Sequence, residues 1–225
     1  MIYITGDTHI PIDIHKLNTK NFPEQKNLTK QDYIIICGDF GGVWNQSKAI
    51  REHMHKLNNR GFTTLFVDGN HENFDVLNAM PVKEWHGGKV HFVEENIIHL
   101  MRGQIFEIDK YSFFTMGGGN SIDKGWRMPG RSWWSEEMPS DLEFEEAIDN
   151  LERVNFQVDY IFTHTAPLSI IRHFYEPDDE LPLCRFLERV KERTTYKKWF
   201  FGHVHKDIDV DEKHIALFNR VVQLK

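Results

Sequence analysis

Short apolar runs alternate with polar segments along the first third of the chain. Three of these runs have the length and the β-branched content of buried strands, at Ile2–Thr5, Tyr33–Cys37 and Thr63–Val67. A short helix is expected at Asp13–Leu17, and Ser47–Asn59 carries apolar residues at i, i+4 and i+7, the spacing of one helix face. Strands that alternate with helices are typical of parallel βαβ units, which we therefore expect here.

The middle of the chain has a different pattern, in which short strands follow one another with only polar or glycine turns between them. These predicted strands are Val90–Val93, Ile97–Met101, Gln104–Ile108 and Tyr111–Met116. Their close spacing predicts a meander of antiparallel pairs. Residues 117–140 follow with no regular periodicity.

Helices and strands alternate again in the last third. A helix is predicted at Asp141–Arg153, with Asp141 as its N-cap, and the acidic residues between Glu136 and Glu146 are expected to be solvated. A second helix is predicted at Leu183–Lys191, behind Pro182. Further strands are predicted at Tyr160–Phe162, Trp199–Phe201, His214–Phe218 and Arg220–Leu224. No linker-like stretch divides the chain, so residues 1–225 are predicted to form one domain.

Five of the predicted strands end in side chains that can bind a metal ion. The motifs are Asp7-x-His9, Gly38-Asp39, Gly69-Asn70-His71-Glu72, His164 and Gly202-His203-x-His205. Imidazole and carboxylate groups together suit Zn, Mn or Fe better than Mg or Ca. Seven potential ligands exceed the need of one tetrahedral ion and suit two ions that share a carboxylate. These seven are Asp7, His9, Asp39, Asn70, His164, His203 and His205.

The order of these motifs resembles the calcineurin-like metallophosphoesterase superfamily, and the resemblance covers residues 5–205. It implies an α/β fold, a four-layer α/β/β/α sandwich of two mixed β-sheets flanked by helices, with a dinuclear metal site at the strand ends. The resemblance assigns the first metal to Asp7, His9, Asp39 and His205. It assigns the second metal to Asp39, Asn70, His164 and His203, with Asp39 bridging the two ions. His71 is implied to donate a proton to the leaving group or to contact the phosphate.

The sequence therefore predicts a metal-dependent phosphoric ester hydrolase that cleaves mono- or diesters by attack of a metal-bound hydroxide on phosphorus. Two divalent ions are expected, Mn²⁺ first, with Fe or Zn as alternatives. The second motif continues as Phe40-Gly41 and lacks the arginine with which phosphoprotein phosphatases of this superfamily contact phosphate, so a small-molecule phosphoester is favoured. A phosphoprotein phosphatase, a nuclease and a non-catalytic scaffold of the same fold are the alternatives.

Segment 117–140 has two interpretations. In the first it is a lid whose Arg127 or Arg131 binds a substrate phosphate and whose tryptophans stack on the substrate. In the second the tryptophans anchor a long loop and the arginines are solvated. The length of the segment favours the lid. Glu72 is expected to orient the site rather than to bind metal, and histidines outside the motifs, such as His91 and His99, are expected to be structural.

Charge and composition narrow the partners. A net charge of -7 argues against a broad surface for long nucleic acid. No apolar run approaches roughly 18 residues, so no membrane span is expected, and the N-terminus lacks the pattern of a signal peptide. Cys37 and Cys184 are expected to be core thiols of a reduced, cytoplasmic protein. The sequence carries no signal for the oligomeric state.

Overall fold

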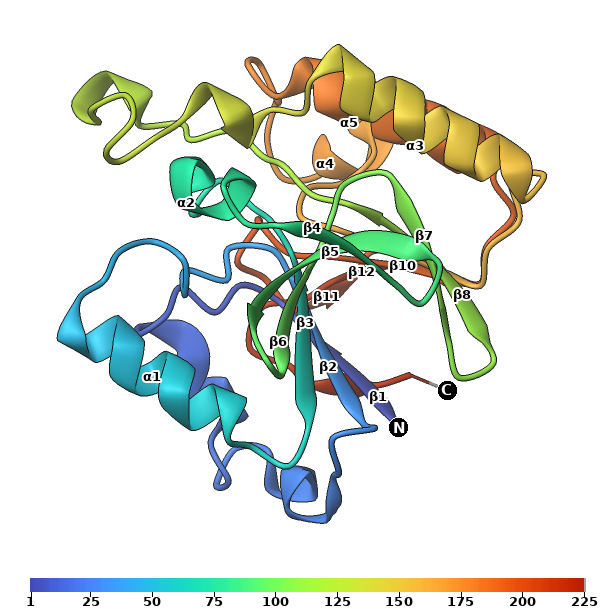
Figure 1. The fold of residues 1–225 in the computed structure, drawn as a ribbon. Coiled ribbons are helices and arrows are strands. Elements are labelled where there is room, and N and C mark those ends of the chain that lie inside the picture. Colours follow the sequence, from blue (N-terminus) through green and yellow to red (C-terminus); the bar gives the residue numbers. More distant parts are fainter. Residues whose placement is uncertain (225) are drawn as a thin grey trace.

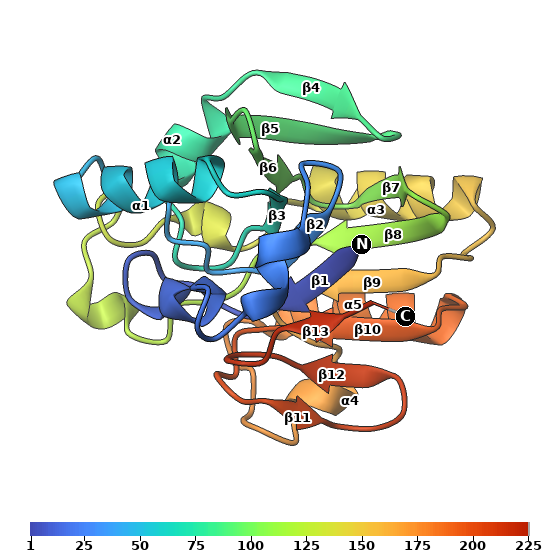
Figure 2. The same cartoon turned by 90° about the horizontal axis from the view of Figure 1, so that it is seen from below.

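Two β-sheets pack face to face, and helices cover their outer sides (Figures 1 and 2). The structure is a computed structural model, and it describes residues 1–224. The first sheet contains β1 (Ile2–Thr5), β2 (Tyr33–Cys37), β3 (Thr63–Val67), β4 (Val82–Trp85), β5 (Gly88–Glu94), β6 (Ile97–Leu100) and β13 (Val222–Gln223). The second contains β7 (Gln104–Ile108), β8 (Tyr111–Met116), β9 (Tyr160–Thr163), β10 (Lys198–Phe201), β11 (Ile208–Asp209) and β12 (His214–Ala216).

Both sheets mix parallel and antiparallel neighbours. The strand orders are β13-β1-β2-β3-β6-β5-β4 and β11-β12-β10-β9-β8-β7. In the first sheet β1, β2, β3 and β6 are parallel, as are β8, β9, β10 and β12 in the second. The remaining strands pair antiparallel at the edges. The parallel centre places the carboxyl ends of several strands at one edge of the sandwich.

The helices form the outer layers. They are α1 (Lys48–Asn58), α2 (Phe74–Asn78), α3 (Asp141–Arg153), α4 (Leu168–Ile171) and α5 (Leu181–Arg193). Short 3-10 helices lie at Asp13–Leu17, Pro23–Asn27, Lys124–Trp126 and Ser135–Glu137. Helix α1 lies against the first sheet, and α3 and α5 run along the second (Figure 1). The predicted four-layer sandwich is thereby confirmed.

Alternation along the central strands builds three apolar layers. In β2, Ile34 and Ile36 pack in the cluster that includes the buried face of α1, whereas Ile35 and Cys37 pack between the sheets. Successive side chains of a strand point to opposite faces, and both faces of this strand are covered. This double burial is why its sequence is apolar throughout rather than alternating.

Two helices that the sequence predicted, α1 and α3, form with different agreement at their ends. In α1, Ile50, Met54 and Leu57 are buried, as their spacing predicted. In α3 the predicted N-cap is wrong by one residue, because Ser140 rather than Asp141 caps the helix. The Ser140 side chain accepts a bond from the backbone N–H of Glu143, whose side chain in turn accepts from the Ser140 N–H, which forms a capping box.

The predicted meander is wrong as a single unit. Its two halves pair antiparallel as expected, β5 with β6 and β7 with β8. However, β6 joins the parallel edge of β3, while β8 joins β9 in the other sheet. The chain crosses to the second sheet after β6, and Phe106 and Ile108 of β7 are buried in the layer between the two sheets.

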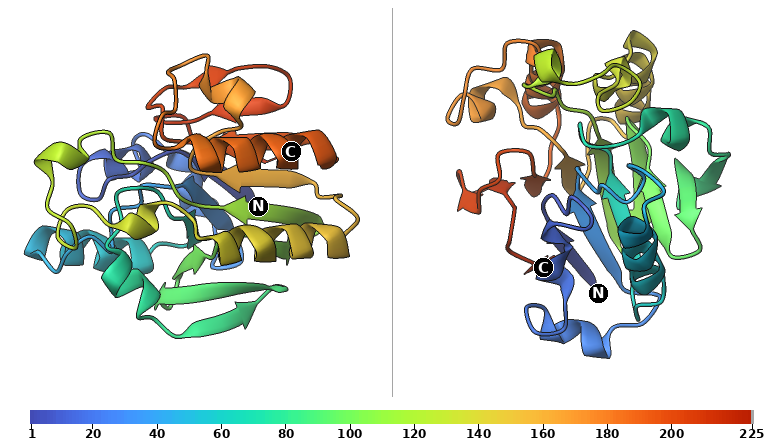
Figure 3. Two further views of the ribbon diagram at one scale, coloured as in Figure 1. Left: turned by 90° about the horizontal axis from the view of Figure 1, so that it is seen from above. Right: turned by 90° about the vertical axis from the view of Figure 1, so that its left-hand side faces the viewer.

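Other departures from the predictions concern short elements. Helices α2 and α4 and strands β4 and β11 were not predicted, and β12 and β13 are shorter than expected. Strand β4 is largely exposed and so lacks the apolar alternation that reveals a strand. Segment 117–140 is mainly irregular. It follows β8 and lies outside the two sheets, at the upper left of Figure 1, and Figure 3 shows it in two further views.

Composition also predicted two core thiols. Cys37 and Cys184 are both buried and unpaired, as expected for core thiols. Across residues 1–224, no helix combines the length and the apolarity that crossing a membrane would require.

Candidate metal centre

The carboxyl ends of five strands meet at one edge of the sandwich, and each is followed by predicted ligands. Asp7, Asp39 and Asn70 follow β1, β2 and β3 of the first sheet. His164 and His203 follow β9 and β10 of the second. Bonds across the sheets fix this convergence, since the backbone N–H of His203 donates to Asp7 Oδ1 at 3.0 Å and His164 Nδ1 donates to the Cys37 carbonyl at 3.0 Å.

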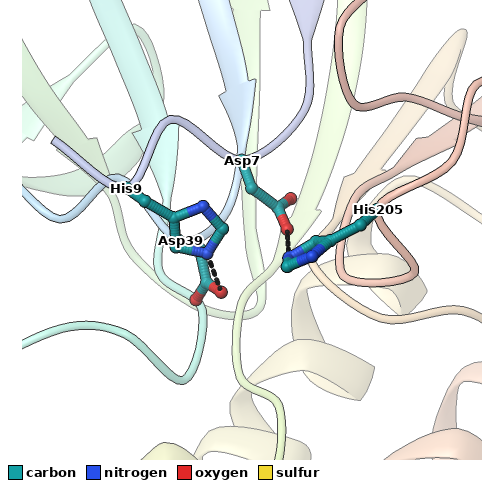
Figure 4. Close-up of side chains that lie close together, drawn as sticks. All are labelled: Asp7, His9, Asp39 and His205. Atoms are coloured by element: carbon teal, nitrogen blue, oxygen red, sulfur yellow. Dashed lines mark hydrogen bonds and ion pairs between the residues drawn. The ribbon is translucent and has the colours of Figure 1, made fainter. Parts of the chain in front are cut away.

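Four of the predicted ligands form a compact group, which we call the first donor group: Asp7, His9, Asp39 and His205. One potential ligand atom from each lies within 4.8 Å of those of the other three. His9 Nε2 lies 3.1 Å from Asp39 Oδ2, and His205 Nε2 lies 3.0 Å from Asp7 Oδ2 (Figure 4). Both carboxylates are buried, whereas His205 is exposed toward solvent. Two carboxylates and two imidazoles at these separations are suitable donors for a divalent metal ion.

The two carboxylates of this group are held in their charged form. Burial by itself would raise the pKa of Asp39, but the neighbouring His164 and His9 lower it well below its usual value. Burial opposes ionisation of Asp7 as well, and His205 and His164 again lower its pKa. Metal binding requires deprotonated carboxylates, so this environment favours the form that binds.

The second donor group consists of Asp39, Asn70, His164 and His203. Because His164 Nδ1 donates to a carbonyl, the neutral imidazole presents a lone pair on Nε2. This Nε2 lies 3.0 Å from His203 Nδ1 and 3.1 Å from Asn70 Oδ1. His203 Nε2 faces the Glu180 carboxylate at 3.4 Å, which leaves its Nδ1 to face the group. Three acceptors so close together require a cation or a proton between them.

The charge on His203 agrees with that requirement. Burial alone would lower the pKa of His203, but Glu180, Asp39 and Asp7 together raise it to about 9. Without metal, a proton on His203 therefore satisfies the converging acceptors, and a bound metal ion would replace it. The donors of the second group thus also fit a divalent ion, and Asp39 belongs to both groups because its Oδ1 lies 3.4 Å from His164 Nε2.

The backbone at these ligands adopts conformations that most residues avoid. His9, Asp39, His203 and His205 all have positive φ angles, between 35° and 64°. Such conformations persist where the surrounding structure enforces them, and they are enriched at functional sites. Position 69 requires glycine for a steric reason, because a Cβ atom there would collide with the Asp39 carboxylate and with the His164 ring.

Comparison with known families bears directly on this arrangement. A family model described as Calcineurin-like phosphoesterase matches residues 1–207 of the 225. The chain belongs to the calcineurin-like phosphoesterase family. None of the curated proteins with which the sequence was compared matches it. Family membership implies binding of divalent metal ions and metal-dependent hydrolysis of a phosphoester.

His71 lies beside the first donor group in this calcineurin-like phosphoesterase. Its backbone N–H donates to Asp39 Oδ1 at 2.8 Å, and its ring packs edge-on against His9 with centroids 5.2 Å apart. Burial lowers the pKa of His71, and the nearby His9 and Arg127 lower it further, although Asp39 raises it. The ring faces a cavity of about 660 Å³ that Asp39, Asn70 and His203 also line.

The two arginines predicted to contact substrate occupy different environments. Arg127 lines the cavity, and its guanidinium donates to His71 Nε2 at 3.4 Å. An ion pair of 2.6 Å with Asp123 and a bond to the Ser132 carbonyl hold it in place. Arg131 is exposed and is not among the described residues that line the cavity. The structure therefore brings only Arg127 toward the site.

The tryptophans of segment 117–140 also differ from one another. Trp134 is buried, donates from Nε1 to Asp75 at 2.9 Å and packs edge-on against Trp44. It anchors the segment, as the structural interpretation expected. Trp126 is 94 % exposed and makes no such contact with any residue from 1 to 224.

Two acidic residues support the site, and only one of them, Glu72, was singled out from the sequence. Glu72 accepts hydrogen bonds from the backbone N–H groups of Phe40 and Gly41, which orients the loop after Asp39. Asp13 was not singled out. It accepts a hydrogen bond from His9 Nδ1 at 2.8 Å, which leaves His9 Nε2 to face the first donor group. Its position four residues after His9 is the only local signal that could have identified it.

Buried charges deeper in the fold had no sequence signal at all. The buried Lys16 donates to the backbone carbonyls of Asp7 and Phe218, and Phe218 stacks on the ring of His205. Burial lowers the pKa of Lys16 to about 8, although Asp7 opposes this shift. Glu180, the partner of His203, is 2 % exposed and accepts from the Tyr175 hydroxyl at 2.6 Å.

Proposed function

We propose that this protein is a dinuclear metal-dependent phosphoesterase that hydrolyses small phosphoric mono- or diesters. The observation that carries the proposal is the convergence of two donor groups on the shared carboxylate of Asp39. His164 Nε2 and His203 Nδ1, 3.0 Å apart, support the second position. Carboxylate, amide and imidazole donors in this proportion suit Mn²⁺, with Fe or Zn as alternatives.

Two divalent ions held by the donor groups would supply Lewis-acid chemistry, which activates a water molecule for attack on phosphorus and neutralises the phosphoryl oxygens. The protein's own residues do the rest. Asp7 and Asp39 supply the negative charge that holds the ions, while Glu180 and the Cys37 carbonyl fix the orientations of the histidine rings. His71 is assigned to protonate the leaving oxygen, because its ring packs beside His9 of the first donor group and lines the cavity.

Arg127 is assigned to the phosphate. Its guanidinium shares the cavity with His71, and Asp123 together with the Ser132 carbonyl restricts its position before substrate arrives. A fixed, planar guanidinium binds phosphate oxygens through charge-assisted hydrogen bonds. Segment 117–140 would thus act as a lid over a single domain of residues 1–225, with Arg127 as its contact to substrate.

The cavity supports a small substrate. Its volume of about 660 Å³ lies within the range typical of small-molecule sites. Its charged lining is mixed, with basic Arg127 and Lys206 and acidic Asp39, Asp123 and Glu176. A long nucleic acid would instead require a continuous basic surface, and the net charge is -7.

A paired assay tests the proposal. Protein stripped of metal and reloaded with manganese, zinc or iron is given a chromogenic phosphomonoester and the matching diester. Metal-dependent hydrolysis of either compound is expected, and the ratio of the two rates assigns the phosphatase or the phosphodiesterase class. Absence of turnover in protein that holds two ions per chain would contradict the proposal and favour the non-catalytic scaffold.

A further inference from the structure

Asn70 can serve as a ligand only if its amide is correctly oriented. The oxygen and nitrogen of the amide have nearly the same shape, but only the oxygen has a lone pair for a cation. In the structure Asn70 Oδ1 faces His164 Nε2 at 3.1 Å, and its Nδ2 points away, toward Ser121 Oγ at 3.3 Å. Some feature of the protein must favour this orientation over the flipped one.

A buried carboxylate provides that feature. Ser121 Oγ donates to Glu137 Oε1 at 3.0 Å, and the Ser121 backbone N–H donates to Glu137 Oε2 at 2.9 Å. Because a carboxylate only accepts hydrogen bonds, it takes the hydroxyl hydrogen of Ser121. The serine oxygen can then only accept from Asn70, so it binds the NH₂ side of the amide.

Burial of the Glu137 carboxylate costs folding free energy. It is fully buried, although the sequence predicted a solvated acidic stretch around it. Among the described residues, no cationic side chain donates a hydrogen bond to its carboxylate, which is held by three N–H or O–H donors: the two from Ser121 and the Trp134 backbone N–H at 3.4 Å. Burying a carboxylate without a cationic partner costs folding free energy, so its presence here indicates a role beyond packing.

We propose that Ser121 and Glu137 are positioning residues that orient the Asn70 amide for the second donor group. Both lie in segment 117–140, so the same segment that carries Arg127 also determines whether the second metal position is complete. The inference rests on the proposed dinuclear function. It extends that function by making the lid a structural part of the metal centre rather than only a cover for substrate.

Two variants test the proposal by metal binding rather than by activity alone. Ser121→Ala removes the acceptor for Asn70 Nδ2. Glu137→Gln replaces an acceptor by an amide whose NH₂ donates to Ser121 Oγ and redirects the serine hydroxyl to Asn70, which favours the flipped amide. We expect each to weaken binding of the second Mn²⁺ by about ten- to a hundredfold, the usual effect of losing a residue that orients a ligand. Binding of the first ion should stay within about twofold.

The measurements are titration calorimetry and electron paramagnetic resonance of manganese-loaded protein. The wild type should bind two ions and give the spectrum of a coupled pair, whereas both variants at limiting manganese should give that of a single ion. Ser135→Ala and Glu136→Gln are matched controls, since both side chains are exposed in the same segment and contact each other rather than Asn70. Ser121→Thr keeps the hydroxyl and should restore the second ion.

The outcomes separate the two proposals. If the wild type and both variants bind two ions with equal affinity, the positioning role is overturned while the proposed function stands. If the wild type binds fewer than two ions, the dinuclear function and this inference fail together. Should Ser121→Ala lose its circular dichroism spectrum, Glu137→Gln decides the question, since it keeps the size of the buried side chain.

Discussion

His164 Nε2 lies 3.0 Å from His203 Nδ1, although these two residues belong to loops that follow different strands. The remaining ring nitrogens are already engaged, by the Cys37 carbonyl and by the Glu180 carboxylate. The protein therefore directs two imidazole nitrogens at one point and holds them there with partners that are themselves buried. A proton on His203 satisfies this arrangement when no metal is bound, and a divalent ion between the rings would replace that proton.

Metal binding should consequently stabilise the folded protein. Adding Mn²⁺ to stripped protein is expected to raise Tm, and at 100 times the Kd one bound ion adds about 2.7 kcal/mol to the free energy of unfolding. Differential scanning calorimetry with and without a chelator measures this. His164→Ala should lose most of the shift from the second ion, while His55→Ala, on the exposed side of α1, should retain the full shift. An unchanged Tm in the wild type would contradict the assignment of the donor groups.

Asp39→Asn should abolish turnover without unfolding the chain. The substitution keeps the shape of a side chain that is 1 % exposed but removes the charge shared by both donor groups. Elemental analysis should find fewer than two ions per chain, and circular dichroism should match that of the wild type. Near-normal rates in fully metal-loaded Asp39→Asn protein would refute the bridging role.

His71→Gln should lower kcat by about 10²- to 10⁴-fold, the range typical of losing a general acid. Both ions should remain bound, because His71 is outside both donor groups. Substrates with better leaving groups need less protonation, so the defect should shrink as the leaving-group pKa falls. A defect independent of the leaving group would assign His71 to phosphate binding instead.

The two arginines of the lid segment provide a matched pair. Arg127→Ala should lower kcat/KM roughly ten- to a hundredfold, the equivalent of losing one charge-assisted hydrogen bond. Arg131→Ala removes the same charge from an exposed position and should leave kcat/KM unchanged. Equal losses in both variants would indicate a general electrostatic effect rather than a contact of Arg127 with phosphate.

A buried histidine pair predicts how stability depends on pH. His91 Nδ1 lies 3.1 Å from His99 Nδ1, and burial followed by the neighbouring His99 lowers the pKa of His91 from 6.5 to about 4. The unfolded chain therefore binds a proton at His91 more readily than the folded protein does. The free energy of unfolding should decrease as the pH falls from about 6.5 to 4, and this contribution should level off below pH 4.

Urea unfolding across that pH range checks the histidine prediction. His91→Asn removes the titrating group, so its stability should depend less steeply on pH than that of the wild type. His55→Asn, at an exposed position on α1, should follow the wild-type profile. Parallel profiles for wild type and His91→Asn would show that other groups control the acid limb.

Predictions from the sequence succeeded where the signal was local. The apolar run of β2 and the i, i+4, i+7 spacing of α1 were interpreted correctly, because burial on both faces of a strand or one face of a helix leaves a periodic pattern. The convergence of the strand ends was predicted from their polar side chains, and the family resemblance grouped Asp7, His9, Asp39 and His205, which the structure brings together. The roles assigned to them remain predictions.

Long-range packing determined what the sequence by itself could not. The pattern of β6 and β7 reports that each has a buried face but not which sheet buries it, so the hairpins were joined into one meander. Arg127 and Arg131 have the same chemistry and lie four residues apart, and only the path of the loop directs Arg127 to His71. From the sequence Glu137 was predicted to be a solvated surface residue, but in the folded protein it is buried and bonded to Ser121.

The sequence alone therefore determined the alternation of strands and helices and singled out the candidate metal ligands, since both depend on residue type and on spacing along a few residues. The tertiary structure decided which sheet takes each hairpin, which arginine reaches the cavity and which buried acids orient the ligands. Those contacts join residues such as Asn70 and Ser121, 51 positions apart, or Asp7 and His203, 196 positions apart. At such separations the packing of the two sheets, rather than any local preference of the chain, selects the partner.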